Sequence, residues 1–217
     1  LLIGTKIIKI IDIYMIYVRN KFSSIWRDGL KMKIIKRELK GVFEITLELQ
    51  EDKRGFFMRT YDENEFKKYG LHRNWVQENH SRSIKKGIIR GLHFQFPPYA
   101  ETKLIRCIRG AILDVFVDLR KNSPTFGEWD SMELSEKNMK CIYIPRGFAH
   151  GFCTLTDISE MLYKHDNCYN SDYEYGIIWN DKDLNIKWPV INPLLSKRDQ
   201  NFRTFKEFVK NYQGIEV

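Results

Sequence analysis

Short apolar runs separated by turn residues dominate the chain from residue 41 to residue 164. The clearest are residues 104–108 and 111–119, which Arg109-Gly110 joins as the turn of a predicted hairpin. The second of these is almost continuously apolar, which is typical of a strand buried on both faces. Further strands are predicted at residues 41–48, 56–59, 128–134, 141–144, 151–155 and 158–164. Strands at intervals of roughly 8–12 residues predict a β-sandwich, a jelly roll or a small barrel.

Two short segments have helical character instead. Residues 62–69 begin at Asp62, whose side chain suits an N-cap, and end before Gly70. Residues 203–212 place three apolar side chains on one face of a helix. We therefore expect one β domain with short helical segments, notably at the C-terminus.

The first 31 residues differ from the rest of the chain. Residues 1–40 carry ten Lys or Arg against three Asp or Glu, whereas the other 177 carry 26 against 25. The apolar stretch 1–18 is interrupted by charges and is too short for a membrane helix, which needs about 20 apolar residues. It also lacks the order of regions found in a signal peptide. We expect residues 1–31 to be an extension outside the functional domain, which would span residues 32–217.

The composition fits a globular β protein. With 217 residues, 43% hydrophobic and 14% aromatic, the chain can bury a full core, and its aromatic residues favour strands. The balanced charge of the main domain argues against the basic face that nucleic acids require. Four cysteines without C-x-x-C spacing favour reduced thiols. We expect a cytoplasmic protein with neither nucleic-acid nor membrane partners.

Two histidines stand among glycine and apolar residues in strand-like sequence. His93 lies in Arg-Gly-Leu-His-Phe-Gln at 90–95, and His150 lies in a similar segment at 145–152. Taken alone, each fits better as a satisfied core residue than as a functional group. A jelly-roll metal site typically has a second histidine two residues after the first, but Gln95 stands there and is a poor ligand. Acid–base chemistry is therefore favoured over metal binding, and we expect no metal or other cofactor.

Acid–base chemistry needs a base, an acid and a charge that stabilises an anionic intermediate. Histidine abstracts protons near neutral pH, and Lys103 can stabilise a developing oxyanion. Tyr163 can deliver a proton, and Asp199 can orient the histidine through its other ring nitrogen. Taken alone, Tyr163 and Asp199 fit better as a strand aromatic and a solvated turn carboxylate. Their assignment therefore depends on the motifs around them.

A series of motifs occurs in order along the chain. They include Ser-Pro-Thr-Phe-Gly at 123–127, Ile-Pro-Arg-Gly-Phe-Ala-His-Gly-Phe at 144–152, Ile-Trp-Asn-Asp at 178–181 and Leu-Ser-Lys-Arg-Asp at 195–199. With the segment around His93, the series covers about residues 32–208 and resembles the dTDP-4-dehydrorhamnose 3,5-epimerase family. The resemblance implies an all-β, cupin-type jelly roll (double-stranded β-helix), a homodimer, and catalysis without a metal.

The resemblance also implies a substrate and site residues. The substrate would be dTDP-4-keto-6-deoxy-D-glucose, inverted at C3 and C5 to dTDP-4-keto-L-rhamnose by proton removal beside the C4 ketone. His93 would be the base, with Asp199 as its partner. Lys103 would stabilise the enolate, and Tyr163 would be the acid on the opposite face. The nucleotide-sugar site would contain Arg54, Gln77, Asn79, Arg90, His150 and Glu174, with Tyr169 stacked on the thymine.

Several positions depart from the family pattern, although the implied catalytic residues are present. Arg59 stands where a carboxylate is usual, Glu101-Thr102 where Gln-Gly is frequent, and Arg198 where lysine is common. These departures bear on the exact nucleotide and sugar more than on the type of reaction. Two alternatives stay open: a 3-only epimerase acting on a related nucleotide sugar, and a non-catalytic cupin that binds sugar nucleotides.

Overall fold

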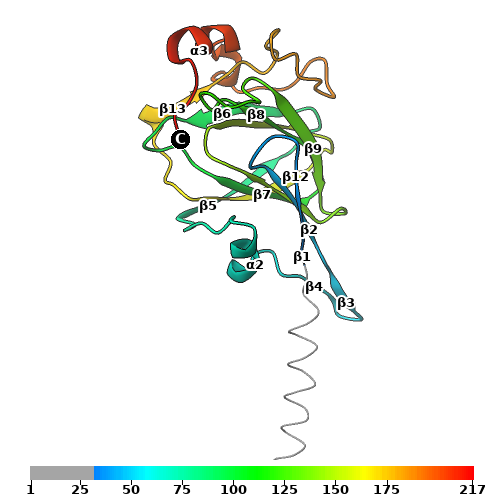
Figure 1. Cartoon of the computed structure of the whole chain (residues 1–217). Coiled ribbons are helices and arrows are strands. Elements are labelled where there is room, and N and C mark those ends of the chain that lie inside the picture. The colour runs from blue at the N-terminus through cyan, green and yellow to red at the C-terminus, as the bar shows by residue number, and fades with distance from the viewer. Residues whose placement is uncertain (1–31) are drawn as a thin grey trace, which may run out of the picture.

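The computed structural model describes residues 32–217, so the expectation for residues 1–31 lies outside the described part of the chain. The described residues form two β-sheets packed face to face, with two short α-helices (Figure 1). The strands are β1 (Met32–Lys36), β2 (Phe43–Leu47), β3 (Gln50–Asp52), β4 (Gly55–Phe57), β5 (Gln77–Ser83), β6 (Ile89–Gln95), β7 (Lys103–Arg109), β8 (Ala111–Asp118), β9 (Trp129–Ser135), β10 (Lys140–Ile144), β11 (Phe148–Thr154), β12 (Ser159–His165) and β13 (Glu174–Gly176). The helices are α2 (Glu63–Lys68) and α3 (Phe205–Tyr212), with 3-10 turns η1 (Ser171–Tyr173) and η2 (Asp199–Asn201).

The two sheets divide the strands almost evenly. One sheet has the order β1-β2-β10-β7-β12-β5, and the other has the order β13-β6-β11-β8-β9. The small β3–β4 hairpin belongs to neither sheet and projects away from them (Figure 1). Strand pairing within both sheets is antiparallel. This is a cupin-type jelly roll, so the predicted all-β fold is confirmed.

The predicted hairpin at Arg109-Gly110 was wrong, although both of its segments are strands. β7 pairs with β10 and β12, whereas β8 pairs with β9 and β11 in the other sheet. The chain therefore crosses from one sheet to the other at Gly110. This residue has φ +72°, and a Cβ on it would lie 2.1 Å from the Ile158 carbonyl oxygen, so the corner requires glycine.

Strand β8 is buried on both faces, as its continuous apolar run predicted. Ile112 and Phe116 belong to the core between the two sheets. Val115 and Val117 point the other way, into a second core that also contains Phe208 of α3. α3 therefore covers the outer face of the five-stranded sheet, which explains why this strand has no polar face.

Both predicted helices are present, and each begins at a side-chain cap. The Asp62 carboxylate accepts hydrogen bonds from the backbone N–H groups at the start of α2. α3 begins with a capping box: Thr204 Oγ1 accepts from the Glu207 N–H, and the Glu207 carboxylate accepts from the Thr204 N–H. α2 packs on the outer face of the six-stranded sheet through Phe66.

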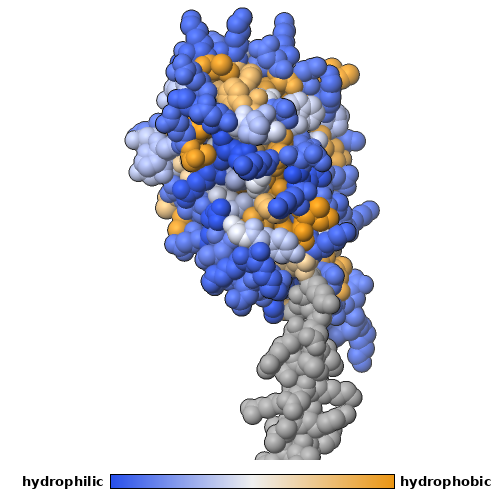
Figure 2. Space-filling view, viewed as in Figure 1, coloured by the Kyte–Doolittle hydropathy of each residue, from blue (hydrophilic) through white to orange (hydrophobic). Residues whose placement is uncertain are grey.

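The visible surface is mostly hydrophilic, with hydrophobic side chains in small separate patches (Figure 2). Within residues 32–217, no helix has the length and apolar character needed to span a membrane. The hydrophilic surface fits a domain whose buried residues are mostly apolar.

Candidate active site

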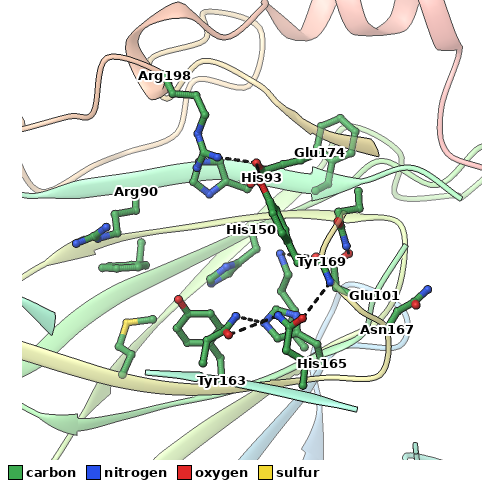
Figure 3. A pocket seen from close by; sticks show the side chains of 17 residues that line it. Arg90, His93, Glu101, His150, Tyr163, His165, Asn167, Tyr169, Glu174 and Arg198 are labelled. Atoms are coloured by element: carbon green, nitrogen blue, oxygen red, sulfur yellow. Dashed lines mark hydrogen bonds and ion pairs between the residues drawn. The ribbon is translucent and has the colours of Figure 1, made fainter. Parts of the chain in front are cut away.

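A pocket of about 320 Å³ lies between the two sheets (Figure 3). It brings together nine of the eleven predicted site residues, and Asp199 lies directly behind its wall. The lining residues are Gln77, Asn79, Arg90, His93, Phe94, Gln95, Glu101, Lys103, His150, Phe152, Met161, Tyr163, His165, Asn167, Tyr169, Glu174 and Arg198.

His93 and His150 face the pocket from neighbouring strands, where they are direct register partners on β6 and β11. The glycines of the two motifs allow this close pairing. A Cβ on Gly91, which has φ +122°, would lie 2.5 Å from the Gly151 Cα atom. The motifs around both histidines therefore contain glycine because β6 and β11 lie in tight contact at these positions.

The pair of His93 and Asp199 has the geometry of a base and its orienting carboxylate. His93 Nε2 lies 2.9 Å from Asp199 Oδ1, and the Asp199 side chain is only 3% exposed. Burial would raise the pKa of Asp199, but bonds from His93, Ser196 and Gly91 outweigh it and hold that pKa below its usual value. The carboxylate is therefore ionised, and His93 Nε2–H donates to it, which leaves Nδ1 free to accept a proton.

His93 is held in its neutral form. Burial lowers the pKa of its imidazole, and the Asp199 carboxylate opposes this shift while Arg198 and Lys103 add to it. Arg198 Nη2 lies 3.3 Å from His93 Nε2, but two N–H donors form no hydrogen bond with each other, so Arg198 acts here through its charge. A neutral imidazole at physiological pH can serve as a general base.

Lys103 lies on the opposite sheet and is almost completely buried. Its Nζ atom lies 3.2 Å from Glu101 Oε1, and the second Glu101 oxygen accepts from the Gln95 amide at 2.8 Å. Gln95 in turn accepts from the Asn170 N–H. Gln95 therefore holds Glu101 in place, and Glu101 holds the ammonium group of Lys103. A buried ammonium group of this kind stabilises negative charge that develops on a nearby oxygen.

Tyr163 and His93 line opposite walls of the pocket. Tyr163 lies on β12 of the six-stranded sheet, and His93 lies on β6 of the five-stranded sheet. A flat ligand between the sheets would have the base on one face and the tyrosine hydroxyl on the other. This is the arrangement needed to remove a proton from one face of a carbon and to return one from the opposite face.

The other predicted binding residues surround the same space. His150 Nε2 bonds to the fully buried Asp114 at 2.8 Å. Tyr169 lines the pocket and is 54% exposed. Its hydroxyl donates to Glu174 at 2.8 Å, and this bond raises the pKa of the phenol. Glu174 also pairs with Arg198 at 2.6 Å. An accessible aromatic face beside arginines suits a nucleotide base and its phosphates.

Arg54 is the predicted site residue that the structure does not bring to the pocket. It lies in the β3–β4 hairpin, its side chain is 81% exposed, and it pairs with Asp52 of the same hairpin. The hairpin projects beyond both sheets, which keeps Arg54 away from the pocket of its own chain (Figure 1). The unusual Arg59 pairs with Asp62 at 2.7 Å and does not line the pocket either.

Sequence reasoning missed His165, although the signal for it was present. Residues two apart on a strand share a face, so Tyr163 on β12 implies that His165 also points into the pocket. Glu101 and Arg198 were noted only as departures from the family pattern. Within residues 32–217, no group of three His, Cys, Asp or Glu side chains is arranged to hold a metal ion.

Fold and site together define a jelly-roll protein whose pocket is equipped for proton transfer beside a carbonyl group. The family model described as dTDP-4-dehydrorhamnose 3,5-epimerase matches residues 36–207. The chain belongs to this family. It is 48% identical to the dTDP-4-dehydrorhamnose 3,5-epimerase of Shigella flexneri over 175 residues, which is 80% of this chain and 96% of that protein.

Solved structures agree with the sequence comparison. The Bacillus anthracis dTDP-4-dehydrorhamnose 3,5-epimerase with bound TDP and PPi is 44% identical, covers 81% of this chain and 100% of its own, and superposes with a TM-score of 0.79. A Legionella pneumophila 3,5-epimerase in complex with dTDP-4-keto-L-rhamnose is 35% identical, covers 81% of this chain and 94% of its own, with a TM-score of 0.77. A dTDP-4-dehydrorhamnose 3-epimerase from Streptomyces niveus is 37% identical over 78% of this chain and 82% of that protein.

Proposed function

We propose that this chain epimerises dTDP-4-keto-6-deoxy-D-glucose at C3 and C5 to dTDP-4-keto-L-rhamnose. The observation that carries the proposal is the placement of His93, backed by Asp199, and Tyr163 on opposite walls of one pocket. Membership of the 3,5-epimerase family supports the nature of the substrate.

The proposed reaction removes one proton and returns one at each carbon, and it needs no oxidant or reductant. Neutral His93 takes the proton from C3, which the neighbouring C4 ketone makes acidic, and the electron pair forms an enolate whose oxygen is stabilised by the Lys103 ammonium. The Tyr163 hydroxyl then gives its proton to the opposite face of C3. Exchange of protons with solvent restores both groups, and the same two steps at C5 invert the second carbon.

The test is proton exchange in deuterated water, followed by NMR. Wild-type protein should place deuterium at C3 and C5 of the substrate, and His93→Ala should lower the exchange rate by about 10²–10⁴-fold. Tyr163→Phe should still allow His93 to exchange protons but should strongly slow inversion. Binding of dTDP to each variant, measured by calorimetry, checks that the pocket is intact. Exchange that is unaffected in His93→Ala would overturn the assignment of the base.

The similarity to a Streptomyces niveus 3-epimerase keeps a 3-only reaction as the alternative. One base and one acid serve either outcome, so the same experiment separates the two. Deuterium at C3 alone would identify a 3-epimerase acting on a related nucleotide sugar. If wild-type protein bound dTDP but exchanged neither proton, it would be a sugar-nucleotide-binding protein without this activity.

We further propose that the functional domain spans residues 32–217 and acts in the cytoplasm. The match to the family begins at residue 36, which supports this boundary. A chain that begins at Met32 should therefore retain the exchange activity, whereas loss of folding would place residues 1–31 within the domain. The proposed partners are the nucleotide sugar and a second copy of the chain, and they include neither a membrane nor nucleic acid. Unpaired Cys107, Cys141 and Cys153 fit a reducing compartment.

A further inference from the structure

His165 is a third histidine in the pocket, and the proposed reaction does not use it. It lies on β12, is only 7% exposed, and has its ring 5.5 Å from the ring of Tyr163. Its Nε2 atom lies 3.4 Å from Nδ2 of Asn79 on the neighbouring strand β5. His165 thus contacts Tyr163, which is the proposed acid, and Asn79, to which the resemblance gives a role in substrate binding.

The direction of the hydrogen bonds around His165 follows from one backbone group. The Tyr169 N–H can only donate, so Gln77 Oε1 accepts from it at 3.0 Å. Gln77 must then turn its Nε2 toward Asn79 Oδ1, at 3.5 Å, which leaves Asn79 Nδ2 to donate to His165 Nε2. We call these four groups, from the Tyr169 N–H through Gln77 and Asn79 to His165, the amide chain.

The amide chain determines where the proton of His165 lies. Because Nε2 accepts from Asn79, a neutral ring must carry its proton on Nδ1. The surroundings also keep the ring neutral: burial and the nearby Lys103 lower the pKa of His165 to about 4, with a smaller contribution from His150, while Glu101 opposes the shift. His165 therefore does not act as a cationic proton donor at neutral pH.

We propose that His165 is a positioning residue that fixes the Asn79 amide and, through Gln77, the Tyr169 backbone. This inference rests on the proposed function, together with the substrate-binding roles that the resemblance implies for Asn79, Gln77 and Tyr169. The amide chain thereby connects β12, which carries the proposed acid Tyr163, to the segment that carries Tyr169. Loss of the acceptor at His165 frees the Asn79 amide to rotate, so it weakens substrate binding more than the chemical step.

The test compares two substitutions of similar size. His165→Met removes the strong acceptor and should raise the KM for the nucleotide sugar and the Kd for dTDP about five- to tenfold, with kcat within about twofold. His165→Gln places an acceptor oxygen near the position of Nε2 and should restore both constants toward those of wild-type protein. The proposal is overturned if Met leaves both constants unchanged, if Gln is as impaired as Met, or if kcat falls by more than about 100-fold. Circular dichroism would detect a variant that fails to fold. In that case the tautomer of His165 in the wild-type protein, measured by NMR, tests the proposal.

A spectroscopic measurement tests the same inference without turnover. In full-length protein labelled with ¹⁵N-histidine, the His165 signals are identified by their loss in His165→Gln. They should report a neutral ring protonated on Nδ1 from pH 8 down to about pH 5. Protonation on Nε2, or titration near pH 6.5, would overturn the amide chain. If wild-type protein exchanges no substrate protons, the proposed function fails, but the tautomer and the dTDP affinity still test the role of His165.

Discussion

At the scale of single residues, the Asp199 carboxylate controls both the orientation and the proton affinity of His93. Asp199→Asn should lower kcat by roughly 10²–10⁴-fold, because the amide can favour the wrong tautomer of the imidazole. Burial already lowers the pKa of His93, and Asp199 is the group that raises it. Its removal should therefore move the acidic limb of the kcat/KM profile to lower pH, as measured by the rate of epimerisation from pH 4 to 8.

The control for this prediction is Glu207→Gln, a carboxylate-to-amide change at an exposed helix N-terminus that does not line the pocket. It should leave the acidic limb in place. An acidic limb of Asp199→Asn that moved to higher pH would contradict the prediction, because it would mean that Asp199 disfavours the imidazolium form of His93.

The sequence indicated some of the site residues more strongly than others. Motifs around His93 and His150 were strong because their glycines serve a specific strand contact. Asp199 and Tyr163 are ordinary residues by themselves, and only the resemblance singled them out. The neutral state of His165 depends on burial and on charges from Lys103 and Glu101, which lie 62 and 64 positions away in the chain. No local pattern carries that information.

At the scale of elements, the capping box of α3 anchors the helix that covers the five-stranded sheet. Thr204→Ala removes the acceptor for the Glu207 N–H and should lower the free energy of unfolding by about 1 kcal/mol. A change of that size should lower Tm by about 2–4 °C for a domain of this length. The measurement is urea or thermal unfolding followed by circular dichroism.

A matched control for the cap is Lys206→Ala, an exposed position in the same helix. It should change the free energy of unfolding by less than about 0.5 kcal/mol. Equal effects of the two substitutions would mean that general helix propensity, and not the cap, accounts for the loss at Thr204.

The elements were predicted better than their pairing. Local patterns located both helices and most of the strands, because period, caps and turn residues act over a few positions. They did not predict β1, β3, β5 or β13. The error at Arg109-Gly110 arose because a glycine turn between two apolar strands fits a hairpin and a corner between sheets equally well. What decides is pairing with distant strands: β7 joins β10 and β12, whereas β8 joins β9 and β11.

At the scale of the whole molecule, the position of Arg54 leads to a test of the proposed homodimer. The resemblance assigns Arg54 to the nucleotide-sugar site, but its exposed side chain lies on a hairpin that projects away from the pocket of its own chain. The same hairpin exposes Phe56, which is 56% accessible. Both facts are reconciled if the hairpin reaches the pocket of a second copy. The chain should then be a dimer by light scattering, and Arg54→Ala should lower kcat/KM about 10- to 100-fold.

A mixed dimer decides whether Arg54 acts on the other copy. His93→Ala and Arg54→Ala chains, co-expressed with different tags and purified as the heterodimer, should be far more active than either homodimer. The Arg54→Ala chain retains His93, and its pocket would receive the intact Arg54 of the other chain. Every pocket stays defective if Arg54 acts within its own chain, because one pocket lacks the base and the other lacks the arginine. A heterodimer no more active than its parents, or a monomeric wild-type protein, would therefore rule out this role of the hairpin.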